Sequence, residues 1–106
     1  MLLDKRKNPR LDFGVLVFSG NKREMTRNIS LNGAFIERDK LNDELPLTPI
    51  GSEIDFSFDF INTRRYIDVK GIVIHHGKND DGMGIWFKKT DEGDKEFIRR
   101  FILDYM

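Results

Sequence analysis

The chain has 106 residues, of which 39% are hydrophobic, 34% are charged and none is cysteine, and its formal net charge is zero. This length favours one domain with a modest core. Without cysteine there is no disulfide framework and no zinc site built on thiolates. The start of the chain lacks the residue order of a signal peptide, and no segment approaches the roughly 20 apolar residues of a membrane helix. We therefore expect a cytoplasmic protein without membrane insertion.

The charge is unevenly placed along the chain. Residues 1–40 carry nine Lys or Arg against five Asp or Glu, a local charge of +4, and the remainder is acidic. A protein that grips many phosphates of a nucleic acid usually has an overall basic face, whereas a local basic cluster suits a small anionic ligand. The pattern predicts no DNA or RNA partner. Composition alone favours another interpretation, a basic tail balanced by an acidic body.

Residues 1–12 are polar and basic, and Pro9 opposes a helix there, so we interpret them as a flexible arm before a single domain over residues 13–106. Within that domain, runs of β-branched and aromatic residues alternate with turn residues at the spacing of short antiparallel strands. The expected strands are 11–18, 22–30, 34–37, 54–60, 66–75 and 83–87.

Two patterns indicate how these strands pack. In 54–60 the apolar residues fall at every second position, which is typical of a half-buried strand. Gly71 inside the next strand predicts a bulge or a close approach. After residue 90 the apolar period becomes helical, which predicts a helix over about 92–104 with acidic residues at its start. The fold class is therefore mainly β, a small six-stranded antiparallel barrel or a sandwich, with a C-terminal α-helix that could close one end.

The sequence offers little for catalysis. His75 and His76 are adjacent on a strand, so their side chains point to opposite faces and cannot share a metal ion. One is expected to be half-packed and the other exposed. The chain has no phosphate-binding loop and no serine in a nucleophile elbow. We expect no enzyme activity, no catalytic residue, no metal and no cofactor.

The arm holds two arginines four residues apart, Arg6 and Arg10, in Arg6-Lys7-Asn8-Pro9-Arg10. Guanidinium groups pair bidentately with phosphate oxygens and with the O6/N7 edge of guanine, and they stack on bases. The spacing alone is weak evidence, because Arg23 and Arg27 repeat it and because a solvated basic segment would look the same.

A second group of polar residues follows at the end of a predicted strand, in Asn28-Ile29-Ser30-Leu31-Asn32-Gly33. The amide of Asn28 can meet a base edge, and the hydroxyl of Ser30 can donate to a phosphate or cap the turn. Gly33 permits positive φ and a close approach of a ligand. Taken alone, these residues are as well explained by an ordinary hairpin turn.

In combination and in this order, the two motifs resemble the signature of the PilZ domain family, R-x-x-x-R followed by [D/N]-x-S-x-x-G. Gly82-Met83-Gly84-Ile85-Trp86-Phe87 is similar to the family's glycine-containing last strand, and residues 91–105 are similar to its closing helix. The resemblance covers nearly the whole chain, and no signature position departs from the pattern.

The resemblance implies a six-stranded antiparallel β-barrel of the PilZ-like, split-barrel type that binds the bacterial second messenger cyclic di-GMP as a ligand. Arg6 and Arg10 would hold guanine and phosphate from the arm. Asn28 and Ser30 would contact a guanine edge and phosphate, and Gly33 would shape the turn. Secondary contacts are expected from Lys5, Lys7 and Trp86, although Trp86 could instead pack against a loop or the helix.

The resemblance further implies a receptor or adaptor that changes conformation on binding cyclic di-GMP and regulates an unidentified effector protein in motility, exopolysaccharide or biofilm control. Two alternatives stay open. One is a PilZ-like protein-interaction module that does not respond to nucleotide, although such members usually lack the arginine pair. The other is a small barrel that binds single-stranded nucleic acid, against which the neutral charge and the inward phenylalanines count.

Overall fold

The computed structural model describes residues 10–12, 14–19, 22–38, 47–60, 63 and 65–105, with the side chains of Arg10 and Leu11 excepted. Of the flexible arm expected over residues 1–12, residues 1–9 lie outside the described part, whereas Arg10 and Leu11 form a short strand paired with residues 29–30. Among the described residues, no helix is long and apolar enough to cross a membrane.

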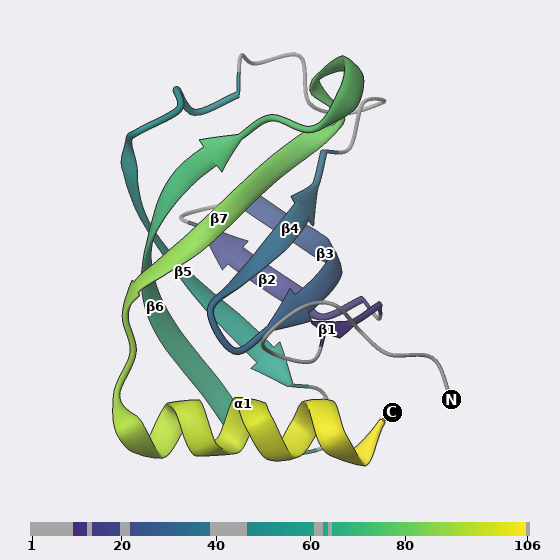
Figure 1. Cartoon of the computed structure of the whole chain (residues 1–106), viewed down its shortest axis with the longest axis vertical. Helices are drawn as coiled ribbons and strands as arrows, with labels where there is room; N and C mark the ends of the chain where they lie inside the picture. Colours follow the sequence, from purple (N-terminus) through teal and green to yellow (C-terminus); the bar gives the residue numbers. More distant parts are fainter. Residues whose placement is uncertain are drawn as a thin grey trace.

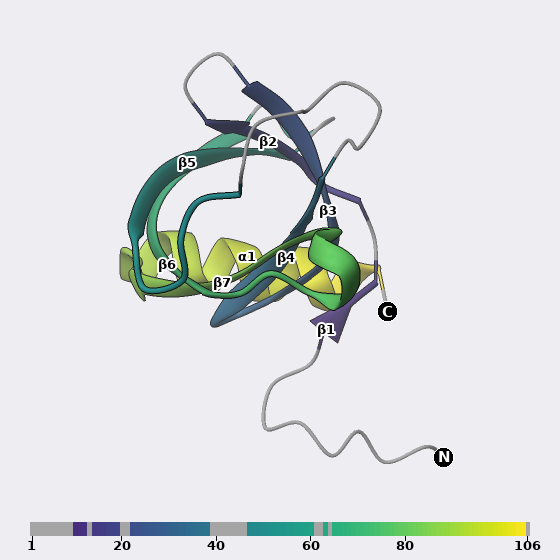
Figure 2. The same cartoon turned by 90° about the horizontal axis from the view of Figure 1, so that it is seen from above.

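Six strands close into an antiparallel barrel, and a short seventh strand is added to it (Figure 1). The sheet order is β1-β3-β2-β5-β6-β7-β4, and β4 returns to pair with β3. Seen from above, β2 to β7 form a ring with the helix across its far end (Figure 2). The predicted six-stranded antiparallel barrel is confirmed. The strands are β1 Arg10–Leu11, β2 Leu16–Ser19, β3 Lys22–Ser30, β4 Gly33–Glu37, β5 Glu53–Phe60, β6 Arg65–His75 and β7 Gly82–Lys89.

The prediction of one continuous strand over residues 11–18 is wrong, because the structure has two separate strands there, β1 and β2. Thr26 of β3 explains the interruption. Its N–H donates to the carbonyl of Val15 at 2.9 Å, and its Oγ1 accepts from the N–H of Val15 at 2.8 Å. A side-chain oxygen thus takes the place of a backbone partner, and Thr26 is the one polar residue in the described part that is fully buried. At Val15 the chain departs from the regular backbone pairing of antiparallel strands, but these two hydrogen bonds keep it attached to β3.

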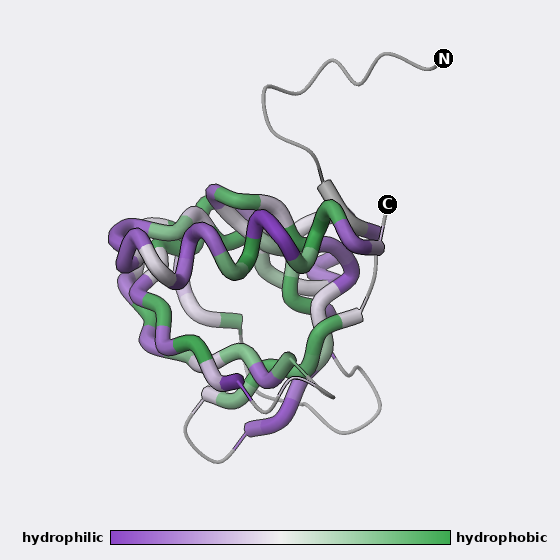
Figure 3. Tube along the Cα trace, turned by 90° about the horizontal axis from the view of Figure 1, so that it is seen from below, coloured by the Kyte–Doolittle hydropathy of each residue, from purple (hydrophilic) through white to green (hydrophobic). Residues whose placement is uncertain are grey.

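The core is built by the alternation predicted for residues 54–60. Phe56, Phe58 and Phe60 are buried, and Ile54 packs against the core from its edge. The ring of Phe58 lies 5.2 Å from that of Phe56 and 5.7 Å from that of Phe87, both edge-on, an arrangement that aromatic pairs prefer. Hydrophobic and hydrophilic residues alternate along the strands in Figure 3. The face of β5 that carries these phenylalanines therefore points into the barrel and forms part of its core.

Gly71 is a close-approach point, as predicted, and the bulge lies opposite it in β7, where Lys88 is the extra residue between Phe87 and Lys89. The register of β6 against β7 shifts between Lys70 and Gly71. A Cβ on Gly71 would lie 2.4 Å from Cγ2 of Ile85, so a side chain of the neighbouring strand β7 fills the space that a side chain at Gly71 would need.

The helix α1 (Glu92–Asp104) closes one end of the barrel (Figure 1). Asp91 caps it by accepting from the N–H of Gly93, and acidic residues follow in the first turn, where the helix dipole favours negative charge. The ring of Phe101 lies 4.7 Å from that of Phe60 at the end of β5. The predicted helix and its closing position are confirmed. Its buried residues are Ile98, Phe101 and Ile102.

Candidate functional site

An open cleft of about 310 Å³ lies on the outer side of β3, β4, β6 and β7. It brings together Asn28, Ser30 and Gly33, the three residues of the predicted second motif. The other side of the cleft comes from β6 and β7, which are distant in sequence and are placed there by closure of the barrel. The lining residues are Asn28, Ser30, Gly33, Ala34, Phe35, Ile74, His75, Gly84 and Ile85.

The second arginine of the arm is placed beside this cleft by its backbone. In the antiparallel pairing of β1 with β3, Arg10 is opposite Ser30 and Leu11 is opposite Ile29. The last residue of the first motif therefore lies on the strand next to the one that carries Asn28 and Ser30. The backbone alone of Arg10 is described, and Arg6, Lys5 and Lys7 lie outside the described residues.

Ser30 and Gly33 hold the short connection between β3 and β4. The hydroxyl of Ser30 donates to the carbonyl of Gly33 at 3.1 Å. Gly33 does not use the positive φ that a glycine permits, since the described glycines with positive φ are Gly51 and Gly77. A Cβ on Gly33 would instead lie 2.5 Å from the carbonyl oxygen of Ile85. The glycine is needed because β4 approaches the backbone of β7 closely.

Asn28 presents its amide to the cleft from a bulge in β3. The register between β3 and β4 shifts between Thr26 and Asn28, which leaves Arg27 as the extra residue. Within the described part of the chain, the side-chain amide of Asn28 makes no hydrogen bond. An amide carries donors and an acceptor, so it can pair with a base edge.

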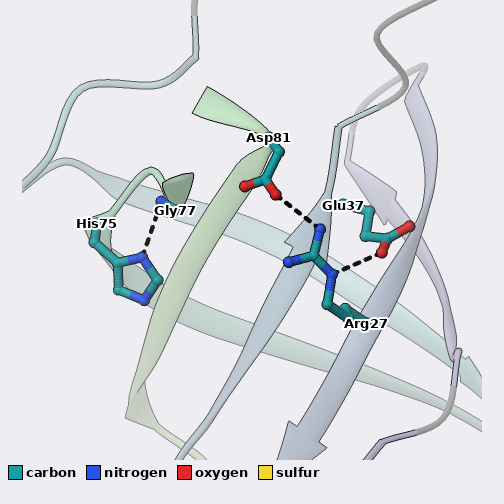
Figure 4. A network of polar contacts seen from close by, with 5 residues as sticks. All are labelled: Arg27, Glu37, His75, Gly77 and Asp81. Atoms are coloured by element: carbon teal, nitrogen blue, oxygen red, sulfur yellow. Dashed lines mark hydrogen bonds and ion pairs between the residues drawn. The ribbon is translucent and has the colours of Figure 1, made fainter. Parts of the chain in front are cut away.

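Arg27 is engaged by two carboxylates (Figure 4). Its Nε lies 2.8 Å from Oε1 of Glu37, and its terminal nitrogen lies 3.1 Å from Oδ2 of Asp81. The hydrogen bonds to Glu37 and then to Asp81 raise the pKa of Arg27. Its guanidinium also lies over the ring of Phe35, 4.5 Å from the ring centre. Because two acids neutralise Arg27, this member of the second arginine pair of the sequence is not suited to hold an anion.

The family model of the PilZ domain matches residues 4–104, nearly the entire chain. The chain belongs to the PilZ domain family.

Solved structures with the same fold agree with this assignment. The Bacillus subtilis inhibitor of motility, MotI/DgrA, superposes with a TM-score of 0.79 at 15% identity, and the match covers 96% of this chain and 51% of that one. The PilZ domain of YcgR from Escherichia coli, solved with c-di-GMP, superposes with a TM-score of 0.71 at 10% identity, covering 96% of this chain and 92% of that one. This PilZ domain thus spans about half the length of MotI/DgrA. A comparison with curated proteins gives no match.

The two histidines of this PilZ domain occupy different surroundings, as expected. His76 is half-buried, and its Nε2 lies 2.7 Å from the carbonyl oxygen of Thr48. His75 is exposed and lines the cleft, a position that the sequence did not predict. Among the described residues, no group of three or more His, Asp or Glu is placed to hold a metal ion.

Trp86 lies on the outer face of β7, opposite Gly33 of β4 on one side and Ile72 of β6 on the other. Its side chain is 47% exposed, so packing against a loop or the helix does not bury it. It borders the cleft of the PilZ domain through Gly33 but does not line it.

A larger cleft of about 600 Å³ contains no residue of either motif. Its charged lining has three carboxylates against two ammonium groups, a balance that repels a doubly charged anion. The hydroxyl of Ser57 donates to Asp68 there, at 2.5 Å. The cleft at Asn28 and Ser30 is therefore the better candidate for an anionic ligand, although it is smaller. The larger cleft is lined by Phe18, Asp55, Phe56, Ser57, Asp68, Val69, Lys70, Lys89 and Asp91.

Proposed function

We propose that this PilZ domain is a receptor for cyclic di-GMP, which binds in the cleft at Asn28 and Ser30 and is clamped by Arg6 and Arg10 from the arm. The observation that carries the proposal is the pairing of β1 with β3, because it sets Arg10 opposite Ser30. Asn28, Ser30 and Gly33 already line one cleft. The backbone of Arg10 thus lies beside the strand that carries Asn28 and Ser30, which supports a shared site for the two motifs.

Charge explains why the arm is needed. Among the described residues that line the cleft, none is Lys, Arg, Asp or Glu. Cyclic di-GMP carries two phosphodiester groups, so a neutral cleft needs cations from elsewhere. Guanidinium groups supply bidentate, charge-assisted hydrogen bonds to phosphate. Arg27, which directly precedes Asn28, is already paired with Glu37 and Asp81, so Arg6 and Arg10 are the cations that the proposal assigns to the ligand.

Residues of the barrel make the other proposed contacts with cyclic di-GMP. The amide of Asn28 meets a guanine edge, and the hydroxyl of Ser30 reaches phosphate while it holds the carbonyl of Gly33. Lys5 and Lys7 add positive charge near the ligand. Trp86 offers an exposed indole beside Gly33, on which a base can stack.

The proposed output is regulation of a partner protein in the cytoplasm, without catalysis by this chain. Ligand binding orders the arm against the barrel edge and changes the surface that a partner meets. The structural neighbour MotI/DgrA is described as an inhibitor of motility. Motility, exopolysaccharide or biofilm control is the class of process that we propose for the partner.

The proposal is tested by a two-dimensional NMR titration of the ¹⁵N-labelled full chain with cyclic di-GMP. We expect saturable shifts of the backbone amides of Arg10 and of residues 28–33, with little change around Asp55 and Lys70 in the larger cleft. GMP at the same phosphate concentration is the control for nonspecific anion binding. If the shifts cluster at the larger cleft, the assigned site is wrong. If folded protein shows no shifts, the alternative of an interaction module that ignores nucleotide is favoured.

A further inference from the structure

His75 reaches the cleft because of an irregularity in β6. The pairing of β6 with β7 sets Val73 opposite Ile85 and His75 opposite Gly84, so one extra residue, Ile74, lies between them. Val73 and Ile85 face the core. In a regular strand, His75 would face the same side as Val73, two residues before it, and would therefore point inward. The bulge therefore aims the imidazole at the outer face, which is a common use of such bulges.

Three contacts fix the ring of His75. It stacks on Phe35, with the ring centres 5.7 Å apart and the planes 26° from parallel. The N–H of Gly77 donates to its Nδ1 at 3.0 Å (Figure 4). A Cβ on Gly84 would lie 2.1 Å from Nε2, so the ring occupies the space that the glycine leaves open.

Phe35 is itself held in place outside the barrel. Added Cβ atoms on Gly77 and on Gly82 would lie 2.8 Å and 2.5 Å from its ring carbons. The guanidinium of Arg27 covers the same ring, and Phe35 is only 7% exposed. His75 thus rests on a buried aromatic support, although the histidine itself is exposed.

The hydrogen bond from Gly77 determines which nitrogen carries the proton. A neutral imidazole has one donor and one acceptor nitrogen. Because Nδ1 accepts from the backbone, Nε2 is the donor in the neutral ring. Within the described part of the chain, Nε2 of His75 has no hydrogen-bond partner. The Nε2–H group of His75 is therefore an oriented hydrogen-bond donor at the cleft that is available to a ligand.

The distance across the sheet indicates which part of the nucleotide this donor meets. Between β1 and β6 the strands follow the order β1, β3, β4, β7 and β6. Four strand spacings of about 4.8 Å place His75 on the order of 19 Å from the strand of Arg10, measured along the sheet. In the proposed complex, Arg6 and Arg10 hold the phosphates of cyclic di-GMP near β1. A guanine base of the ligand then extends toward β6, and guanine presents two acceptors, O6 and N7, on one edge.

We infer that His75 is a ligand-contacting, specificity-determining residue, whose Nε2–H donates to the O6/N7 edge of one guanine. The inference rests on the proposed function. Adenine carries an amino donor where guanine has O6, so it would oppose this N–H. His75 therefore selects cyclic di-GMP over cyclic di-AMP, in addition to what the two sequence motifs contribute.

The test compares His75→Gln, His75→Asn and His75→Ala by calorimetry at about pH 8, where a solvated imidazole is neutral. A Gln amide can place a donor near the position of Nε2, whereas an Asn amide reaches only as far as Nδ1. We expect His75→Gln to keep the wild-type affinity for cyclic di-GMP within about threefold. His75→Asn and His75→Ala should lose on the order of 3- to 10-fold, the value of one neutral hydrogen bond, and lose discrimination against cyclic di-AMP by a similar factor.

Gly84→Ala supplies an independent variant, because its methyl group would displace the imidazole. It should weaken binding in the wild-type background and have little further effect in a His75→Ala background. Thermal melts of all variants check that the barrel is folded. In the ligand-free protein, ¹⁵N NMR of the imidazole should show the proton on Nε2, and a proton on Nδ1 would overturn the inference.

The binding outcomes separate the two proposals. If the wild-type protein binds cyclic di-GMP and all three His75 variants bind equally well, the role of His75 is wrong while the proposed function stands. If the folded wild-type protein does not bind, the proposed function fails and the inference fails with it.

Discussion

Arg10 and Ser30 are opposite residues in the antiparallel pair of β1 and β3, although they belong to different sequence motifs. The pair is short, since β1 consists of Arg10 and Leu11. A strand of this length adds few backbone hydrogen bonds, so its attachment to the barrel depends on its surroundings. Thr26 holds the segment between β1 and β2, because it bonds in both directions to Val15, the residue directly before β2.

Thr26→Val should destabilise the domain by about 1–3 kcal/mol, because it leaves the N–H of Val15 buried without its acceptor. Thr26→Ser keeps the hydroxyl and is the matched control, for which we expect a loss of about 1 kcal/mol from the missing methyl group. Urea unfolding of both variants measures the difference. Equal stabilities for the two variants would show that the Val15 hydrogen bond contributes nothing.

Gly33→Ala should destabilise the domain by about 1–3 kcal/mol, because the new methyl group would lie 2.5 Å from the carbonyl oxygen of Ile85 and backbone must move. Asn32→Ala, at the exposed neighbouring position, is the control and should change the stability by less than about 0.5 kcal/mol. Chemical denaturation measures the free energy of unfolding of both variants. A Gly33→Ala protein as stable as the wild type would mean that β4 and β7 are not as close as described.

Phe101→Ala should cost about 3–5 kcal/mol, since the ring is buried against Phe60 at the end of the barrel. Leu103 lies on the same helix with 51% of its side chain exposed, so Leu103→Ala should cost less than about 1 kcal/mol. The free energies of unfolding test whether α1 closes the core. Similar losses for the two variants would contradict this role of the helix.

The pair of Lys88 and Glu53 should make a small contribution to stability that depends on pH. The hydrogen bond from Lys88, and then its charge, lower the pKa of Glu53. Because the folded-state pKa is the lower one, the contribution is complete above the unfolded value of about 4.3 and is lost as the pH falls through the folded value.

We therefore expect Glu53→Gln to melt slightly below the wild type at neutral pH, with the two melting temperatures converging below about pH 4. The difference should be small, because both side chains are about half exposed. Thermal unfolding from neutral to acidic pH measures it. A gap in melting temperature that is the same across this range would contradict the assignment.

The sequence predicted most of the barrel, because its strands and helix differ clearly in apolar period. Phe56, Phe58 and Phe60 lie inside, as their alternation indicated. The interruption between β1 and β2 could not be predicted, since it depends on a hydroxyl of Thr26 that reaches across from another strand. Local patterns report local structure, whereas this contact exists only after the strands have paired.

The same limit applies to the site. Asn28, Ser30 and Gly33 are close in sequence, so a motif could identify them together. His75 joins them through a bulge at Ile74 and through closure of the barrel. A pair of adjacent histidines on a strand gave no sign of this. The role of Arg27 was equally hidden, because its two acidic partners, Glu37 and Asp81, come from distant segments.

Cyclic di-GMP binding through Arg10 is tested most directly by calorimetric titration of the full chain, at moderate salt and at two temperatures. We expect saturable binding by the wild type and at least about tenfold weaker binding by Arg10→Ala, because a charge-assisted contact is lost. Arg23→Ala, from the second arginine pair, should bind like the wild type, and all three proteins should melt alike. Absence of binding by the folded wild type, or equal affinity in Arg10→Ala, would contradict binding through Arg10.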